Sequence, residues 1–349
     1  MEVIKYPSKA DWPSLVKRPA LDVTTLFDTV RTVLNEVRSE GDTAVKRYEK
    51  KFDKVTLSGL QVSEEEIKEA RELVSEDLKQ AIRTAKANIE KFHASQRFTG
   101  QKVETTSGVT CWQKAVAIEK VGLYIPGGTA PLFSTVLMLA VPAHIAGCKE
   151  IVLCTPPNRE GKVHPAILFA AETAGVSKIF KAGGIQAIAA MAYGTESVPK
   201  VYKIFGPGNQ YVTAAKQLVS LKDVAIDMPA GPSEVEVIAD GTANPDFIAA
   251  DFLSQAEHGA DSQAMLVTSA ESIVSPVVDA IQQQLSELSR KDITAKALEH
   301  SRIIVLKDEQ EVIAFTNMYA PEHLIIQTEN YAHIAEQIEN AGSVFMGPY

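Results

Sequence analysis

From about residue 103 onward, short runs of β-branched and other apolar residues alternate with segments of helical periodicity. This alternation is typical of parallel, largely buried sheets with helices on both faces. Nine such runs are many for one sheet, so the pattern predicts two α/β units. The expected strands are Ala115–Ile125, Glu150–Cys154, Lys178–Lys181, Val201–Phe205, Val235–Ala239, Ala264–Thr268, Ile303–Leu306, Leu324–Gln327 and Val344–Met346.

The first hundred residues are predicted to be helical, because apolar residues recur there at helical spacing. One helix is expected to end at Gly41. Ser63 followed by Glu66 forms a capping box that opens another helix. A longer helix is expected to begin after Ser75 and to end at Gly100.

Two turns rich in glycine and proline, at residues 126–128 and 229–232, are natural joints between the units. A segment that enters and leaves there is predicted to be a domain inserted into another domain. The predicted division is an N-terminal arm of residues 1–16, a larger α/β domain of residues 17–123 and 234–349, and an inserted α/β domain of residues 124–233.

Composition narrows the class of protein. The net charge is −9, from 44 acidic and 35 basic residues, and this balance disfavours a nucleic-acid partner, which needs a dense basic surface. The cysteines, Cys111, Cys148 and Cys154, are odd in number and lack a CxxC spacing, so reduced thiols in a cytoplasmic protein are expected. The first residues lack an apolar signal core, and no apolar stretch is long enough for a membrane span.

Two polar residues mark the end of a predicted helix that begins at Asn244–Pro245 and stops at Gly259. Gln255 and His258 are three residues apart, so they share a helical face. Imidazole is a good zinc ligand and an amide oxygen is a weaker one, but a catalytic zinc takes three or four protein ligands. A surface or capping histidine explains the same pattern.

A second pair, Glu322 and His323, follows Pro321 at the junction of a loop and a strand. A neutral histidine can take the proton of an alcohol, and a carboxylate can activate water. Neighbouring strand residues point to opposite faces, so the two share a cleft only if the backbone turns there. A strand-end histidine beside a solvated glutamate is the alternative.

Three glycine-rich turns, at residues 124–130, 205–209 and 230–233, could bring backbone N–H groups close to a phosphate. The turn that starts at Gly206 comes nearest to a dinucleotide fingerprint, but Tyr211 occupies its third glycine position. Ordinary tight turns between strands and helices account for the same glycines.

Together these segments resemble the histidinol dehydrogenase family, and they occur in the family's order along essentially the whole chain. The motifs that carry the resemblance are Val121–Ala130, Phe205–Asn209, Asp227–Glu234, Ser254–His258 and Tyr319–Leu324. The resemblance implies two Rossmann-like units and a zinc-dependent enzyme of histidine biosynthesis. Such an enzyme oxidises L-histidinol to L-histidine in two NAD-dependent steps through an aldehyde.

Residue roles follow from the resemblance alone. Glu322 and His323 match the acid–base pair, with His323 taking the hydroxyl proton and Glu322 activating water. The remaining matches are Gln255 and His258 as zinc ligands, Ser233, Gln255, His258 and His323 as substrate contacts, and Tyr124, Gln186 and Asn209 as NAD contacts. The larger domain would then hold the substrate and metal, and the inserted domain would hold NAD.

The family forms intertwined homodimers, and its members continue past the last residue here, Tyr349. The further stretch carries the other two zinc ligands, an aspartate and a histidine. We therefore expect weak or absent zinc binding and little activity for this polypeptide. One alternative is a non-catalytic truncated paralogue or fragment that binds NAD or substrate. The other is an enzyme that acts on a different amino alcohol.

Overall fold

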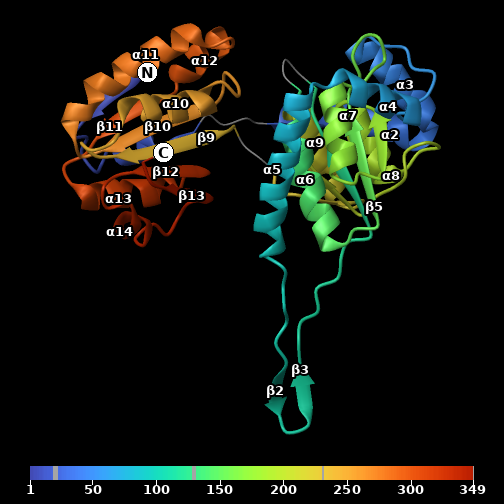
Figure 1. The fold of residues 1–349 in the computed structure, drawn as a ribbon, viewed down its shortest axis with the longest axis horizontal. Coiled ribbons are helices and arrows are strands. Elements are labelled where there is room, and N and C mark those ends of the chain that lie inside the picture. The colour runs from blue at the N-terminus through green and yellow to red at the C-terminus, as the bar shows by residue number, and fades with distance from the viewer. Residues whose placement is uncertain (19–22, 128–130, 230–231, 349) are drawn as a thin grey trace. The chain divides into compact units, whose positions relative to one another are not determined.

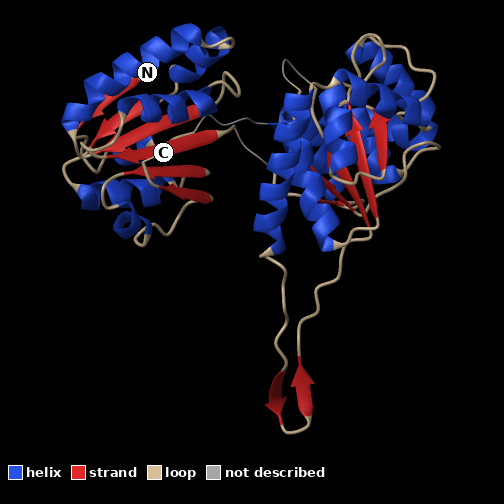
Figure 2. Cartoon of the chain, viewed as in Figure 1, coloured by secondary structure: helices blue, strands red, loops and turns tan. Residues whose placement is uncertain are grey.

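The computed structural model describes residues 1–18, 23–127, 131–229 and 232–348, and the chain forms two compact units. Unit 1 comprises Met1–Leu21 and Ala230–Tyr349, and unit 2 comprises Asp22–Pro229. Each unit is a parallel sheet with helices on both faces, as Figure 2 shows, so the predicted α/β class is confirmed.

Unit 1 contains a six-stranded sheet in the order β1-β11-β10-β9-β12-β13, with every neighbouring pair parallel. The strands are β1 (Glu2–Lys5), β9 (Glu234–Ala239), β10 (Gln263–Thr268), β11 (Arg302–Val305), β12 (His323–Gln327) and β13 (Ser343–Met346). One face packs against α10 (Pro245–Ala256), α11 (Val274–Glu287) and α12 (Lys291–Leu298). The other face packs against α1 (Trp12–Leu15), α13 (Glu309–Tyr319) and α14 (Tyr331–Ala335), as Figure 1 shows.

Strand β9 shows why this sheet is buried on both sides. Val235 and Val237 join the core under α10, whereas Ile238 joins the core under α13. Side chains of a strand alternate between the faces, so a strand covered on both sides is apolar almost throughout. Glu234 and Glu236 are the buried exceptions in β9, and both lie on the α13 side with Ile238.

Unit 2 contains a five-stranded parallel sheet in the order β6-β5-β4-β7-β8. Its strands are β4 (Lys120–Tyr124), β5 (Glu150–Thr155), β6 (Lys178–Lys181), β7 (Lys203–Phe205) and β8 (Ala225–Ile226). One face packs against α2 (Phe27–Glu40), α3 (Asp42–Tyr48), α8 (Gly184–Tyr193) and α9 (Gln210–Ser220). The other packs against α4 (Glu64–Leu73), α5 (Glu76–Ala94), α6 (Phe133–Ala146) and α7 (Pro165–Thr173).

An antiparallel hairpin, β2 (Val103–Thr106) with β3 (Val109–Cys111), connects α5 to β4. It extends away from the sheet and helices of unit 2 on two long connecting segments (Figure 1). Large apolar side chains on and beside it are exposed. They are Phe98, Val103, Val109, Trp112 and Val116.

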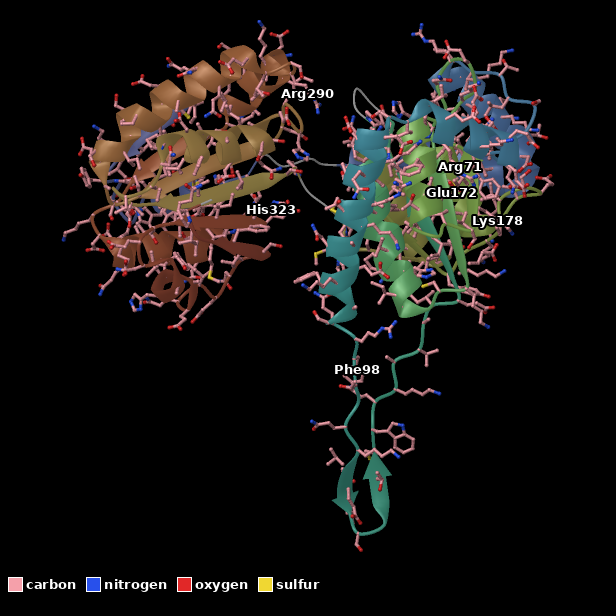
Figure 3. The ribbon with its side chains drawn as sticks, viewed as in Figure 1. Arg71, Phe98, Glu172, Lys178, Arg290 and His323 are labelled. Atoms are coloured by element: carbon pink, nitrogen blue, oxygen red, sulfur yellow. The ribbon has the colours of Figure 1, made fainter. Side chains whose placement is uncertain are left out.

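The predicted domain boundaries need correction. Residues 23–123 pack with residues 124–229, because Val30 and Val33 of α2 share a buried core with Ile188 of α8. Arg71 of α4 also forms an ion pair with Glu172 of α7, as Figure 3 shows. Helices α2 to α5 therefore complete unit 2 instead of joining residues 234–349. Residues 1–16 are not a separate arm, because β1 pairs with β11 in the unit 1 sheet.

All nine predicted strands exist, with ends shifted by a few residues. Strands β1, β2, β3 and β8 were not predicted. These strands are short, and β1, β2 and β3 lack a buried face that would give them an apolar pattern. The capping box of Ser63 and Glu66 is confirmed by both of its hydrogen bonds. Helix α5 ends at Ala94, six residues before the predicted end at Gly100.

Candidate functional site

Three neighbouring strands of unit 1 begin at the same edge of its sheet. His323 opens β12 opposite Val235, and Gln263 opens β10 opposite Glu234. Ser233 directly precedes β9, and its carbonyl accepts a 3.1 Å hydrogen bond from Gln263 N. The predicted residues Ser233, Glu322 and His323 therefore lie at this amino-terminal edge.

Helix α10 brings the predicted metal ligands to the same edge. The Asn244 side chain caps the helix by accepting a 2.9 Å bond from Asp246 N, as the sequence predicted. The helix follows β9 and precedes β10, so its carboxyl end returns to the edge where β10 begins. Gln255 lies in its last turn and is buried. His258 is exposed in the turn beyond the helix, with its N bonded to Gln255 O at 3.2 Å. The helix thus stops earlier than the predicted end at Gly259.

One hydrogen bond fixes how α10 lies along β12. Gln327 Nε2 donates to Asp251 Oδ2 at 2.6 Å, and Ile325 packs against the core that α10 covers. Strand alternation places His323 on this same face. Along the helix, residue 258 lies ~10 Å beyond Asp251. Along the strand, residue 323 lies ~13 Å before Gln327. Both paths lead to the amino-terminal edge, which brings the end of α10 and His323 to one side of the sheet.

The imidazole of His323 has a defined tautomer. Its Nδ1 lies 3.0 Å from the carbonyl oxygen of Glu234, and a carbonyl can only accept. Nδ1 therefore carries the proton, and the lone pair of Nε2 stays available. His323 is half-buried, and Figure 3 shows it at the start of β12.

Glu322 lies just outside the strand with an exposed side chain. The chain turns before it at Ala320, whose φ of 53° is in the left-handed region. The Glu322 N–H donates a 3.0 Å bond to Oε1 of Glu234. The structure thus brings Glu322 and His323 to one edge of the sheet, where both contact Glu234.

The donor atoms present fit part of a zinc site. Gln255 offers an amide oxygen and His258 an imidazole nitrogen, and neither side chain forms a hydrogen bond within the described part of the chain. A zinc site usually needs three or four protein donors. In the ranges that the structure describes, no group of three or more His, Cys, Asp or Glu side chains could hold a metal ion.

Two residues at this edge were not predicted from the sequence. The buried carboxylate of Glu234 accepts hydrogen bonds from the Arg18 guanidinium, through Nη2 at 2.8 Å and through Nε. An acidic residue that opens an otherwise apolar strand was the available signal for Glu234. Nothing in the sequence around Arg18 linked it to residues more than 200 positions away.

The predicted NAD residues all lie in unit 2. In its sheet the chain moves from β4 to β5 and β6, then returns to place β7 on the other side of β4. Ligands of open α/β sheets bind where the strand order reverses in this way, beyond the carboxyl ends of the strands. Tyr124 ends β4, and Asn209 follows β7 and caps α9 by accepting bonds from Tyr211 N and Val212 N. Both predicted contacts therefore flank the reversal point.

Gly206 lets two backbones approach at this reversal point. Its φ is 128°, and a Cβ there would lie 2.1 Å from the carbonyl oxygen of Tyr124. The Gly206 N–H donates to Asp227 at 2.8 Å, and its carbonyl accepts from the buried Lys216 at 2.8 Å. The close packing therefore requires glycine. Residues 128–130 and 230–231 of the other two predicted turns lie outside the described residues.

Gln186 is fully buried in α8, where Nε2 donates to Glu49 Oε1 at 2.8 Å. The N–H of Gly183 bonds the same oxygen at 2.8 Å, and Gly184 N donates to the Tyr124 hydroxyl at 3.0 Å. Burial raises the pKa of the Glu49 carboxyl to about 7. The start of α8 is thus already filled by a carboxyl of the chain itself, and Gln186 serves that contact.

Comparisons with known proteins point to one family. The family described as histidinol dehydrogenase matches residues 16–349. A histidinol dehydrogenase from Bacteroides thetaiotaomicron is 71% identical over 347 residues, which cover 99% of this chain and 81% of that protein. One from Bacteroides fragilis is 67% identical over 349 residues, covering 100% of this chain and 82% of the relative.

A solved structure agrees with these relatives. The crystal structure of histidinol dehydrogenase from Elizabethkingia anophelis aligns with a TM-score of 0.98 at 54% identity. The alignment covers 100% of this chain and 81% of that chain.

Among the described residues, no helix is both long enough and apolar enough to cross a membrane.

Proposed function

Because this chain belongs to the histidinol dehydrogenase family, we propose that Glu322 and His323 perform the acid–base chemistry of its reaction. The enzyme is an NAD-dependent oxidoreductase of histidine biosynthesis that oxidises L-histidinol to L-histidine through histidinal. A non-catalytic relative is not favoured, since the identity to histidinol dehydrogenases runs through nearly the whole chain.

The observation that carries this proposal is the single hydrogen bond from His323 Nδ1 to the Glu234 carbonyl. It leaves Nε2 as the basic nitrogen, ready to accept the hydroxyl proton of histidinol. When that O–H bond breaks, its electron pair forms the carbonyl of the aldehyde, and the hydride on carbon departs. NAD, when bound, accepts that hydride.

Glu322 would serve the second oxidation. Its exposed carboxylate lies beside His323 at the start of β12 and can take a proton from water as the water oxygen adds to the aldehyde carbon. The resulting hydrate carries the C–H bond from which the second hydride leaves. Ser233 lies at the same edge of the sheet, so we propose it as a substrate contact.

Gln255 and His258 are the residues that would hold zinc in this proposal. Their amide oxygen and imidazole nitrogen fit zinc coordination, and the carboxyl end of α10 favours a positive charge. Zinc there would act as a Lewis acid that binds the imidazole and amine of the substrate. The remaining donors are not among the residues that the structure describes at this edge.

We propose that NAD binds at the carboxyl edge of the unit 2 sheet, beside Tyr124 and Asn209. Asn209 caps α9, and a helix amino terminus suits a pyrophosphate. We assign Gln186 of α8 to the same site as a buried residue that supports its shape, since its amide contacts Glu49.

Two further expectations complete the proposal. The exposed apolar side chains of the β2–β3 hairpin support an intertwined homodimer, because such surfaces commonly mark protein interfaces. The three cysteines form no disulfide, which supports a cytoplasmic enzyme.

Variants of the acid–base pair test the proposal. His323→Asn should slow NADH formation from histidinol, and Glu322→Gln should slow NADH formation from added histidinal, each by on the order of 10² or more. Arg302→Ala is the control in the same sheet, because Arg302 contacts Leu15 and lies outside the proposed site. Wild-type rates for both His323→Asn and Glu322→Gln would refute the assignment.

A further inference from the structure

We infer that Arg18 and Glu234 are positioning residues of the reaction, because their ion pair holds the turn that presents Glu322 beside His323. The inference rests on the roles proposed above for Glu322 and His323. Neither Arg18 nor Glu234 needs to touch the substrate for this role. All the contacts that support it lie within unit 1.

Glu234 stands directly beneath the turn. It is the first residue of β9 and is 7% exposed. Its Oε1 accepts from Arg18 Nη2 at 2.8 Å and from the Glu322 N–H at 3.0 Å. Its Oε2 accepts from Arg18 Nε and from the Tyr319 hydroxyl at 3.3 Å. A buried carboxylate with a forked guanidinium and two further donors has little freedom to move.

Arg18 links the Glu234 carboxylate to the residues that precede Glu322 in the turn. Its Nη2 also donates to the carbonyl oxygen of Ala320 at 2.8 Å and to that of Tyr319. Its guanidinium lies 4.5 Å from the centre of the Tyr319 ring. One side chain from the N-terminal segment therefore clamps residues 319 and 320 to Glu234.

The turn needs such a clamp, because Ala320 adopts a φ of 53° without being glycine. A left-handed alanine persists only when neighbouring contacts hold it. The Glu322 carbonyl oxygen accepts a 2.9 Å bond from Ser343 N, but its N–H depends on the Glu234 side chain. His323 is held by its ladder to β9 and β13 on both sides and by the Glu234 carbonyl. Loss of the clamp should thus displace Glu322 more than His323.

This difference gives a result that a merely structural pair would not produce. Arg18→Ala and Glu234→Gln should reduce NADH formation from added histidinal by on the order of ten- to a hundredfold, since a displacement of about 1 Å has that effect. The first hydride transfer from histidinol, followed as a single turnover, should fall by less than threefold. The KM for NAD should stay unchanged, because NAD is proposed to bind unit 2.

Conservative and control variants sharpen the test. Arg18→Lys keeps the charge but loses the forked donor, so it should restore part of the histidinal rate. Arg302→Ala is the matched control, because Arg302 also anchors the N-terminal segment, through Leu15 O at 2.8 Å, without contacting the turn. Its rates should equal those of the wild type.

Two results would overturn the inference. One is a normal histidinal rate in Arg18→Ala and Glu234→Gln. The other is a fall of both half-reactions in equal proportion, with the same pattern in Arg302→Ala. Parallel assays of Glu322→Gln and His323→Asn separate the two proposals. If these variants are inactive while the Arg18 and Glu234 variants are normal, only the clamp is wrong; if they are fully active, the site assignment itself fails.

Discussion

Replacing Glu236 by glutamine should make unit 1 progressively more stable than the wild type as the pH rises. Glu236 is fully buried in β9, and burial raises the pKa of its carboxyl from 4.5 to about 8. The Thr316 hydroxyl donates to Oε1, but Oε2 has no hydrogen-bond partner among the described residues. The folded protein therefore favours the protonated, uncharged carboxyl at neutral pH.

The sign follows from proton linkage. A group with a raised folded-state pKa contributes stability that is fully present below the unfolded pKa, near 4.5, and is lost as the pH rises through about 8. Each tenfold difference in proton affinity corresponds to ~1.4 kcal/mol. The contribution of Glu236 to the free energy of unfolding should thus fall by roughly 4 kcal/mol between pH 4.5 and pH 8.

Glutamine has no charge to lose, so Glu236→Gln removes this dependence. Its amide nitrogen would occupy the place of the unpartnered Oε2, with a pH-independent cost of about 1–3 kcal/mol. The test compares the free energy of unfolding of the variant with that of the wild type. What matters is how this difference changes with pH, and not its value at one pH. Between pH 5 and pH 8, the free energy of unfolding of the variant should rise by roughly 3 kcal/mol or more relative to that of the wild type.

Urea unfolding of both proteins at half-unit steps of pH measures this difference. Glu271→Gln is a control of opposite sign, because the hydrogen bond from Lys5 lowers the pKa of the exposed Glu271 carboxyl. That variant should lose a little stability above pH 4.5 and gain none. A difference between Glu236→Gln and wild type that stays constant from pH 5 to pH 8 would refute the reasoning.

Two smaller changes test the unit 2 geometry. Gly206→Ala should raise the KM for NAD more than tenfold and lower the melting temperature, because the added Cβ would lie 2.1 Å from the Tyr124 carbonyl oxygen. Unchanged NAD kinetics would argue against a cofactor site at this turn. Ser63→Ala should cost ~1 kcal/mol in urea unfolding with normal turnover, since it removes only the cap of α4, and Ser63→Asp should restore the stability.

The fold was largely predictable because its signals are local. Buried parallel strands are nearly continuous apolar runs, and helix caps such as Ser63 and Asn244 act within four residues. The domain boundary was not predictable in the same way. Apolar faces of α2 and α5 need a partner, but their sequence does not say whether residues 124–229 or 234–349 supply it. The packing in unit 2 depends on side-chain fit between distant segments.

The site was predictable only as separate pairs. Motif residues such as Gln255 and His323 could be named, but their placement at one edge depends on strand order β10-β9-β12, which skips β11 in sequence. The clamp was beyond prediction for the same reason, since Arg18 and Glu234 are 216 positions apart. Gln186 was expected to contact NAD, yet the structure buries its amide against Glu49. A role of Gln186 in the NAD site stays a prediction.

The two proposed sites use opposite edges of their sheets, and the charge of each ligand explains why. In unit 2 the reversal point lies at the carboxyl edge, where helices such as α9 begin and their free N–H groups suit a pyrophosphate. In unit 1 the proposed site lies at the amino edge, where α10 ends and its free carbonyl groups suit a cation. Zinc and the substrate amine are cations, and the Glu234 carbonyl at this edge is also what leaves His323 Nε2 as a base. A parallel sheet thus offers an anion site at one edge and a cation site at the other, and the two proposed sites use one of each.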